Sequence, residues 1–208
     1  MKMNEELVQE PMHYRISGRD YILILLKNGD LYLKNRRGEN YDGFPVKLGS
    51  EIGNRVYVDL KRTIKNSFIR IITDLGTLYN ISFDGKIISK IEKLRPDKSS
   101  KFKMIMDALD KNPIIISLEN NKIYKDEYYI NFKNSSNLTF QYYNFGNDKK
   151  FIIFNDPSSK KSYFYSPNLE TYMPSLPSSN NVSIIYSKSS FKFYTIFNNT
   201  LSMIDIKK

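Results

Sequence analysis

A short apolar run, a tight polar turn and a second apolar run follow one another five times along this chain of 208 residues. The turns are polar or contain glycine, and they are Asn28-Gly29, Asp74–Gly76, Asn120-Asn121, Pro157–Lys160 and Asn198-Asn199. One anchor residue after each turn marks the repeat, at Tyr32, Tyr79, Tyr124, Tyr163 and Ser202, with spacings of 47, 45, 39 and 39 positions. A period in this range is typical of propellers and other repeat folds.

The middle strands of the repeats constrain the fold further. The run 21–26 reads Tyr-Ile-Leu-Ile-Leu-Leu, so both faces of this strand are apolar and both must be covered. A radial stack of small sheets covers both faces of every inner strand, whereas a two-sheet sandwich covers one. We therefore predict an all-β fold, a β-propeller of about five four-stranded antiparallel blades. The blades either close into a five-blade ring or form a partial propeller.

The repeat also predicts the domain organisation. An N-terminal tail, residues 1–11, precedes a single propeller-like domain at 12–208, with blades at 12–50, 51–94, 99–133, 137–175 and 181–206. The last blade lacks a fourth strand, which leaves an open edge. A strand at Met12–Ile16 either opens the first blade or fills this gap. The segment Ser99–Asp110 fits an amphipathic helix or a strand, and the repeat favours the strand.

Two segments resemble β-propeller repeats of the WD40-like and PQQ-like kinds. Residues 28–46 contain Asn-Gly-Asp-Leu-Tyr, Asn-Arg-Arg-Gly and Gly-Phe-Pro-Val, and residues 74–86 contain Asp-Leu-Gly-Thr-Leu-Tyr and Asp-Gly-Lys. Most of the chain is also similar to the C-terminal propeller region of large uncharacterised envelope-associated proteins of Bacteroidetes. The resemblance implies a propeller with no assigned chemistry. The chain has no Trp, so it lacks the Trp-Asp signature of WD40 blades and the Trp-docking pattern of quinone-dependent propellers.

Composition limits the chemistry and the location. The chain has no Cys, which excludes disulfides and thiolate metal sites. Its nearest match to a calcium loop, residues 155–157, supplies too few oxygens, so we expect neither metal nor cofactor. No signal peptide or membrane span is visible. The expected location is the cytoplasm by default, or the cell envelope if the chain is a fragment of a longer exported protein.

Catalytic patterns are weak in this sequence. His13 is the only histidine, and no Gly-x-Ser-x-Gly motif or phosphate-binding loop accompanies it. The acidic pairs at residues 5–6, 107/110 and 126–127 are best interpreted as solvated charges. We therefore expect no catalytic residues and no enzyme.

Basic doublets with tyrosines nearby are the candidate binding residues. The net charge is +10. A surface that contacts anionic partners would be formed by Arg36, Arg37, Tyr41, Lys149, Lys150, Lys160 and Lys161. The leading hypothesis is a non-catalytic scaffold that binds an unidentified protein partner through its loop faces. The alternatives are a basic module that binds polyanions or nucleic acid, and a carbohydrate-active enzyme with carboxylates at strand ends. Association through the open edge, or membership of a larger propeller, also fits the pattern.

Overall fold

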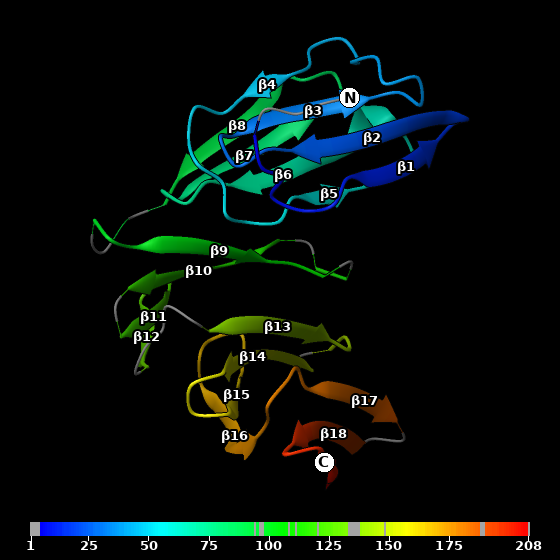
Figure 1. Ribbon diagram of the computed structural model, residues 1–208. Coiled ribbons are helices and arrows are strands. Elements are labelled where there is room, and N and C mark those ends of the chain that lie inside the picture. Colours follow the sequence, from blue (N-terminus) through cyan, green and yellow to red (C-terminus); the bar gives the residue numbers. More distant parts are fainter. Residues whose placement is uncertain are drawn as a thin grey trace. The chain divides into compact units, whose positions relative to one another are not determined.

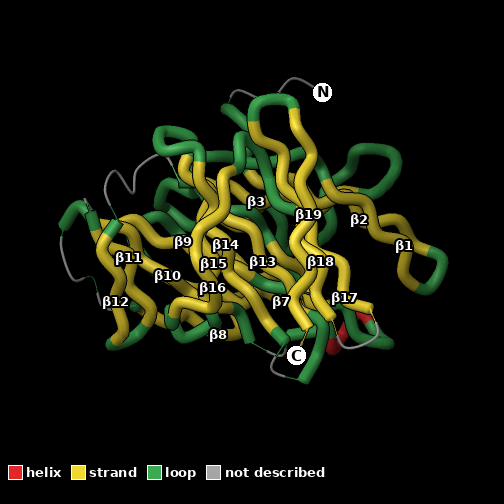
Figure 2. The backbone as a smooth tube through the Cα atoms, turned by 90° about the horizontal axis from the view of Figure 1, so that it is seen from below, coloured by secondary structure: helices red, strands yellow, loops and turns green. Residues whose placement is uncertain are grey.

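The computed structural model describes residues 5–93, 95, 98–107, 109–110, 112–119, 121–132, 138–147, 149–187 and 190–207. The described chain consists of strands, loops and one short 3-10 turn, η1 (Ile64–Asn66), as Figure 2 shows. None of its helical segments is long and apolar enough to cross a membrane. The chain divides into two compact units, Met1–Met104 and Ile105–Lys208.

The first unit contains two four-stranded sheets (Figure 1) and residues 101–104 of a third sheet. The strands of the first sheet are β1 (Met12–Ile16), β2 (Arg19–Leu25), β3 (Asp30–Lys34) and β4 (Val46–Lys47). The strands of the second sheet are β5 (Tyr57–Asp59), β6 (Phe68–Ile72), β7 (Thr77–Ser82) and β8 (Ile87–Glu92). Each sheet is an antiparallel meander in which neighbours in sequence are neighbours in space.

Three further meanders follow, of four, four and three strands. The third sheet contains β9 (Lys101–Ile105), β10 (Ile114–Glu119), β11 (Lys122–Lys125) and β12 (Tyr128–Asn131). The fourth contains β13 (Thr139–Asn144), β14 (Lys150–Asp156), β15 (Lys161–Tyr165) and β16 (Thr171–Pro177). The fifth contains β17 (Ser183–Ser187), β18 (Ser190–Phe197) and β19 (Thr200–Lys207).

Within each unit, the apolar cores lie between consecutive sheets. In the first unit one cluster joins alternate residues of β2 and β3 to Ile69, Ile71 and Ile81 of the second sheet. In the second unit β14 is buried on both faces. Its Ile152 and Phe154 pack with the third sheet, and its Phe151 and Ile153 pack with the fifth. A strand that is apolar on both faces is thus covered on both, as its sequence requires.

The structure confirms the predicted all-β fold and its four-stranded antiparallel sheets. The strand interpretation of residues 99–110 holds as far as Ile105, and the chain then turns between Asp107 and Asp110. The fifth sheet lacks a fourth strand among the described residues, as expected. The suggestion that Met12–Ile16 fills this gap is wrong, because β1 pairs with β2 in the first sheet. The predicted turn residue Asn120 lies outside the described residues.

Candidate functional site

A polar groove of about 440 Å³ lies where loops meet at the ends of the fourth and fifth sheets. It is lined by residues from the start of β13, the end of β14 and the β16–β17 link: Thr139, Asn155, Asp156, Pro157, Ser178, Ser179, Asn180 and Asn181. Amide, hydroxyl and carboxylate groups supply the polar part of this lining. Loops carried at the ends of rigid strands are where binding residues concentrate in folds of this kind.

A partly buried polar network fixes the groove wall. The Gln141 side chain accepts a hydrogen bond from the Val182 amide at 2.8 Å and donates one to the Val182 carbonyl at 2.9 Å. The same glutamine oxygen accepts from the Asn155 side-chain amide at 3.0 Å, and the Asn155 oxygen accepts from the Ser162 hydroxyl at 2.7 Å. Asn155 is 7% exposed, so its bonds form away from water and hold the wall rigidly.

Backbone hydrogen bonds anchor the β16–β17 link on the other side of the groove. The Ser178 amide donates to the Lys160 carbonyl at 2.9 Å, and the Ser179 amide donates to the Ile196 carbonyl at 2.7 Å. The link is therefore tied both to the β14–β15 turn and to β18. In the sequence, residues 178–181 read Ser-Ser-Asn-Asn and carry no recognisable motif.

The groove suits recognition by hydrogen bonds more than it suits catalysis. Asp156, 7% exposed, is the one carboxylate among its described lining residues, and it accepts a hydrogen bond from the Ser158 amide at 2.9 Å. A glycosidase needs two opposed carboxylates about 5–10 Å apart, and one carboxylate does not provide that arrangement. The exposed Lys160 and Lys161 follow Asp156 in the β14–β15 hairpin and add positive charge close to the groove.

Three of the candidate residues predicted from the sequence lie in the first unit. Arg36 and Arg37 are exposed in the hairpin turn after β3. Tyr41 is half-buried, stacks on Tyr21 with ring centroids 4.7 Å apart, and donates a hydrogen bond to the Asp20 carbonyl at 2.8 Å. Tyr41 therefore supports the core of the first unit, while the two arginines are free to meet solvent.

The four candidate lysines lie on the fourth sheet, at opposite ends of β14. Lys149 and Lys150 are at its start, whereas Lys160 is the last residue of the turn after its end and Lys161 is the first residue of β15. A strand of this length separates the two doublets by about 20 Å. The Lys149 ammonium lies 4.6 Å from the centroid of the Tyr186 ring, and the Lys150 ammonium lies 2.8 Å from the Asp110 carboxylate.

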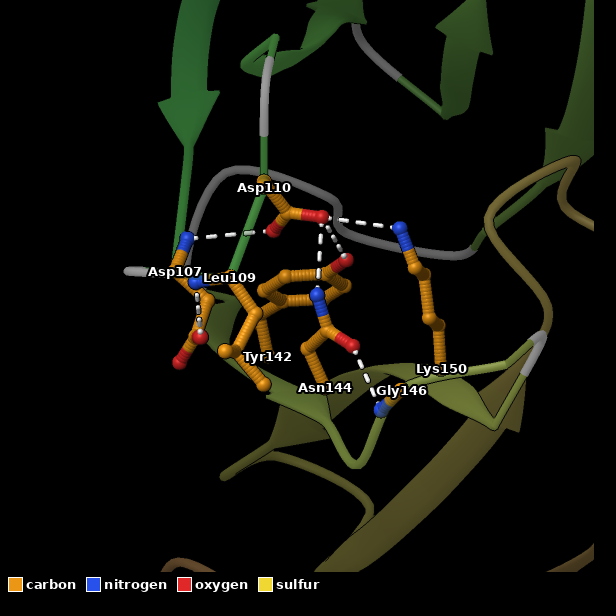
Figure 3. A network of polar contacts seen from close by, with 7 residues as sticks. All are labelled: Asp107, Leu109, Asp110, Tyr142, Asn144, Gly146 and Lys150. Carbon is orange, nitrogen blue, oxygen red and sulfur yellow. Dashed lines mark hydrogen bonds and ion pairs between the residues drawn. The ribbon is translucent and has the colours of Figure 1, made fainter.

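Asp110 is the centre of a polar network that Figure 3 shows. Its Oδ1 accepts hydrogen bonds from the Tyr142 hydroxyl at 3.2 Å, the Asn144 amide at 2.9 Å and the Lys150 ammonium at 2.8 Å. Its Oδ2 accepts from the Asp107 backbone amide at 3.2 Å. The network ties the turn after β9 to β13 and β14. Four donors from three chain segments converge on this one carboxylate, so its role is to hold these segments together.

The interpretation of residues 107 and 110 as solvated charges is wrong for Asp110, because its side chain is 4% exposed. No signal in the sequence pointed to this burial, since the side-chain donors come from residues 32 to 40 positions further along the chain. The groove was missed for the same reason. Its polar residues are unremarkable in sequence and become a site only when three chain segments meet.

His13, the histidine weighed as a catalytic residue, belongs to the first unit. His13 is on β1 with a side chain that is 59% exposed, and its Nε2 lies 3.0 Å from the Asp20 carboxylate of the neighbouring strand. Within the described part of the chain, no group of three or more His, Cys, Asp or Glu residues is placed to hold a metal ion.

Tyr142 gives the Asp110 network a pH dependence. Burial, and next the Asp110 charge, raise the Tyr142 pKa well above its ordinary 10.0. The Tyr142 pKa is therefore higher in the folded state than in the unfolded state. The neutral hydroxyl stabilises the fold fully below pH 10, and this contribution is lost as the pH rises above 10. We expect urea unfolding at pH 8, 10 and 11 to show a steeper alkaline loss of stability for the native protein than for Tyr142→Phe. Tyr128→Phe, at an exposed residue of β12, is the control. Parallel curves for the native protein and Tyr142→Phe would contradict this assignment.

Comparison with known proteins supports the fold alone. No family model matches the chain, and no curated protein matches its sequence. Two structures of BBS1N in complex with ARL6DN, soaked with mercury and with lead, are similar at TM-scores of 0.53 and 0.56 and identities of 13% and 12%. The matches cover 95% and 99% of this chain but 64% and 67% of those chains.

BamB from Moraxella catarrhalis matches at a TM-score of 0.48 and 13% identity, over 90% of this chain and 61% of that chain. This chain thus spans about two thirds of the length of the solved structures it resembles. The five antiparallel sheets are blades of the β-propeller type.

Proposed function

We propose that this protein is a non-catalytic β-propeller scaffold that binds a partner protein through the polar groove at the ends of the fourth and fifth sheets. The observation that carries the proposal is the groove itself. Its wall is held rigid by the network of Gln141, Asn155 and Val182, and its lining offers amide, hydroxyl and carboxylate groups. A rigid site with several polar groups loses little entropy when it binds an extended polypeptide.

The charge of the rim indicates the character of the partner. Lys160 and Lys161 are exposed beside the groove, and the whole chain carries +10. Such a rim accelerates encounter with an acidic surface and helps to select it. Lys149 and Lys150 contribute less, since each already has an intramolecular contact. This reduces the continuous basic surface that a nucleic-acid binder would need, and it favours an acidic protein segment.

Charge reversal of the two hairpin doublets tests the proposal. Tagged native protein and the variants Lys160→Glu/Lys161→Glu and Arg36→Glu/Arg37→Glu would be expressed in the source organism, and the bound proteins quantified by mass spectrometry. We expect the lysine variant to lose the partner by about tenfold, which corresponds to about 1.4 kcal/mol of binding free energy. The arginine variant carries the same change in charge in a different exposed turn, and it should retain the partner.

Two outcomes would overturn this proposal. Equal recovery of all proteins by both variants would exclude the groove rim as the binding site. Equal loss in both variants, together with recovery of nucleic acid that falls steeply with salt, would assign the protein to polyanion binding instead. The resemblance to envelope-associated Bacteroidetes proteins extends the proposal to a partner in the cell envelope, which fractionation of the source cells would test.

A further inference from the structure

The outer edge of the fifth sheet differs from the outer edges of the other four. It is formed by β19, which has eight residues, no proline and an uninterrupted register with β18. The other last strands are short, as in β4 and β12, or follow an irregular register, as in β8 and β16. Proteins shorten, bend or charge exposed edges to prevent unwanted pairing. Within the described chain, β19 is the one last strand that is both long and paired in an unbroken register.

The hairpin that leads into β19 shows which backbone groups face outward. Its two turn residues, Asn198 and Asn199, have φ values of 48° and 61°, as a type I′ turn requires. Phe197 and Thr200 close the turn, so hydrogen-bonded pairs recur at every second residue from there. Ser202, Ile204 and Ile206 therefore bond to β18. The amides and carbonyls of Leu201, Met203, Asp205 and Lys207 face the open edge.

The side chains of β19 are apolar where solvent would favour polar ones. Leu201 is 66% exposed, Met203 50% and Ile204 38%. A groove of about 410 Å³ runs along one face of the strand, and its apolar lining includes Leu176, Pro177, Phe197 and Ile204. A strand added beside β19 would place every second side chain next to this groove. The edge supplies hydrogen bonds, and the groove supplies a place for aliphatic side chains.

Charge decides which strand would occupy this edge. A second copy of the chain would bring another net charge of +10 against the first. Asp205 lies opposite Lys192 of β18, whereas Lys207 lies opposite Ser190 and has no acidic cross-strand neighbour. By strand alternation, the charged residues on this face of β18 and β19 are Lys192, Asp205 and Lys207, which leaves a net positive charge. An incoming strand with acidic residues on this face would complement that charge, and basic residues would be opposed by it.

We propose that the β19 edge binds an extended acidic segment of a partner protein, which adds antiparallel to β19 as the fourth strand of the fifth sheet. Aliphatic residues of that segment face the groove beside Ser202 and Ile204, and acidic residues alternate with them on the opposite face. Strand addition of this kind gains affinity from main-chain hydrogen bonds and specificity from alternate side chains. This edge is a surface separate from the polar groove, so either proposal can fail without the other.

Amide hydrogen exchange measured by NMR tests the geometry of strand addition directly. The probe is a ten-residue peptide in which glutamate alternates with valine, and its comparison is the same peptide with lysine in place of glutamate. In the free protein we expect fast exchange at Leu201, Met203 and Asp205, and slow exchange at Ser202 and Ile204. The glutamate peptide should slow the three outward amides by about tenfold or more, since each gains a hydrogen bond.

A proline variant provides the second measurement. Met203→Pro removes an outward-facing amide without breaking a bond to β18, and Met203→Val retains that amide as the matched control. We expect Met203→Pro to weaken binding of the fluorescein-labelled glutamate peptide about tenfold, while Met203→Val binds like the native protein. Far-UV circular dichroism confirms that both variants fold.

The proposal is overturned by any of three results. The first is that neither peptide protects the outward amides. The second is that both peptides protect them equally, which removes the charge argument. The third is that the amides become protected as protein concentration rises without peptide, which assigns the edge to a second copy. If Met203→Pro does not fold, the slowing of the outward amides of the native protein by the glutamate peptide decides the question alone.

Discussion

Alanine in place of Gly85 should lower the free energy of unfolding by about 3 kcal/mol, because it combines backbone strain with a steric clash. Gly85 lies in the β7–β8 turn with a φ of 77°, in the left-handed region that side chains disfavour. A Cβ atom here would also lie 2.9 Å from the Gly43 Cα and closer still to the Gly43 carbonyl. Because the obstacle is backbone, it cannot move aside as a side chain could. Thermal unfolding should show a melting temperature lower by about 10 °C.

Gly38 provides a matched control for this prediction. It occupies the equivalent position of the turn after β3, with a φ of 82°, and no atom lies within 4 Å of a Cβ placed there. Gly38→Ala thus carries the backbone strain without the clash, and should cost about 1 kcal/mol. The difference between the two variants measures the close approach of the first two sheets. Equal losses of stability would show that Gly43 and Gly85 do not restrict each other.

The positions of the strands and turns could be predicted because they depend on local chemistry. Gly38 and Gly85 are 47 positions apart in sequence, and both adopt the positive φ that a tight turn needs. Asn198 and Asn199 likewise form the turn between β18 and β19. Residues 151–154 read Phe-Ile-Ile-Phe, apolar on both faces like the run 21–26, and β14 is covered by two separate clusters. These features require no knowledge of distant contacts.

The close approach of Gly85 to Gly43 could not be predicted, because it depends on how two sheets pack. The sequence shows why Gly85 needs conformational freedom, but it does not show that a backbone segment fills the space beside it. The polar groove has the same origin. Gln141 and Val182 are 41 residues apart, and neither belongs to a recognisable motif. Their contact is a consequence of the packing of the fourth and fifth sheets.

Removal of the Asp110 carboxylate should have the second large effect. Asp110→Ala leaves the Tyr142, Asn144 and Lys150 donors without their common acceptor. The loss of one partner from a buried ion pair costs about 3–5 kcal/mol, and we expect about 3 kcal/mol since the Lys150 side chain is 32% exposed and recovers part of its hydration. Urea unfolding at pH 7 measures this change.

Two further variants separate the network from a general loss of structure. Asp107→Ala removes a second carboxylate from the same turn. Among the described bonds, this carboxylate accepts one hydrogen bond, from the Leu109 amide, so its loss should lower the free energy of unfolding by about 0.5 kcal/mol. Lys150→Met combined with Asp110→Ala removes the unpaired charge, so the double variant should be more stable than the sum of the single losses predicts. Additive losses, or equal effects at Asp107 and Asp110, would show that Asp110 does not hold the turn after β9 to β13 and β14.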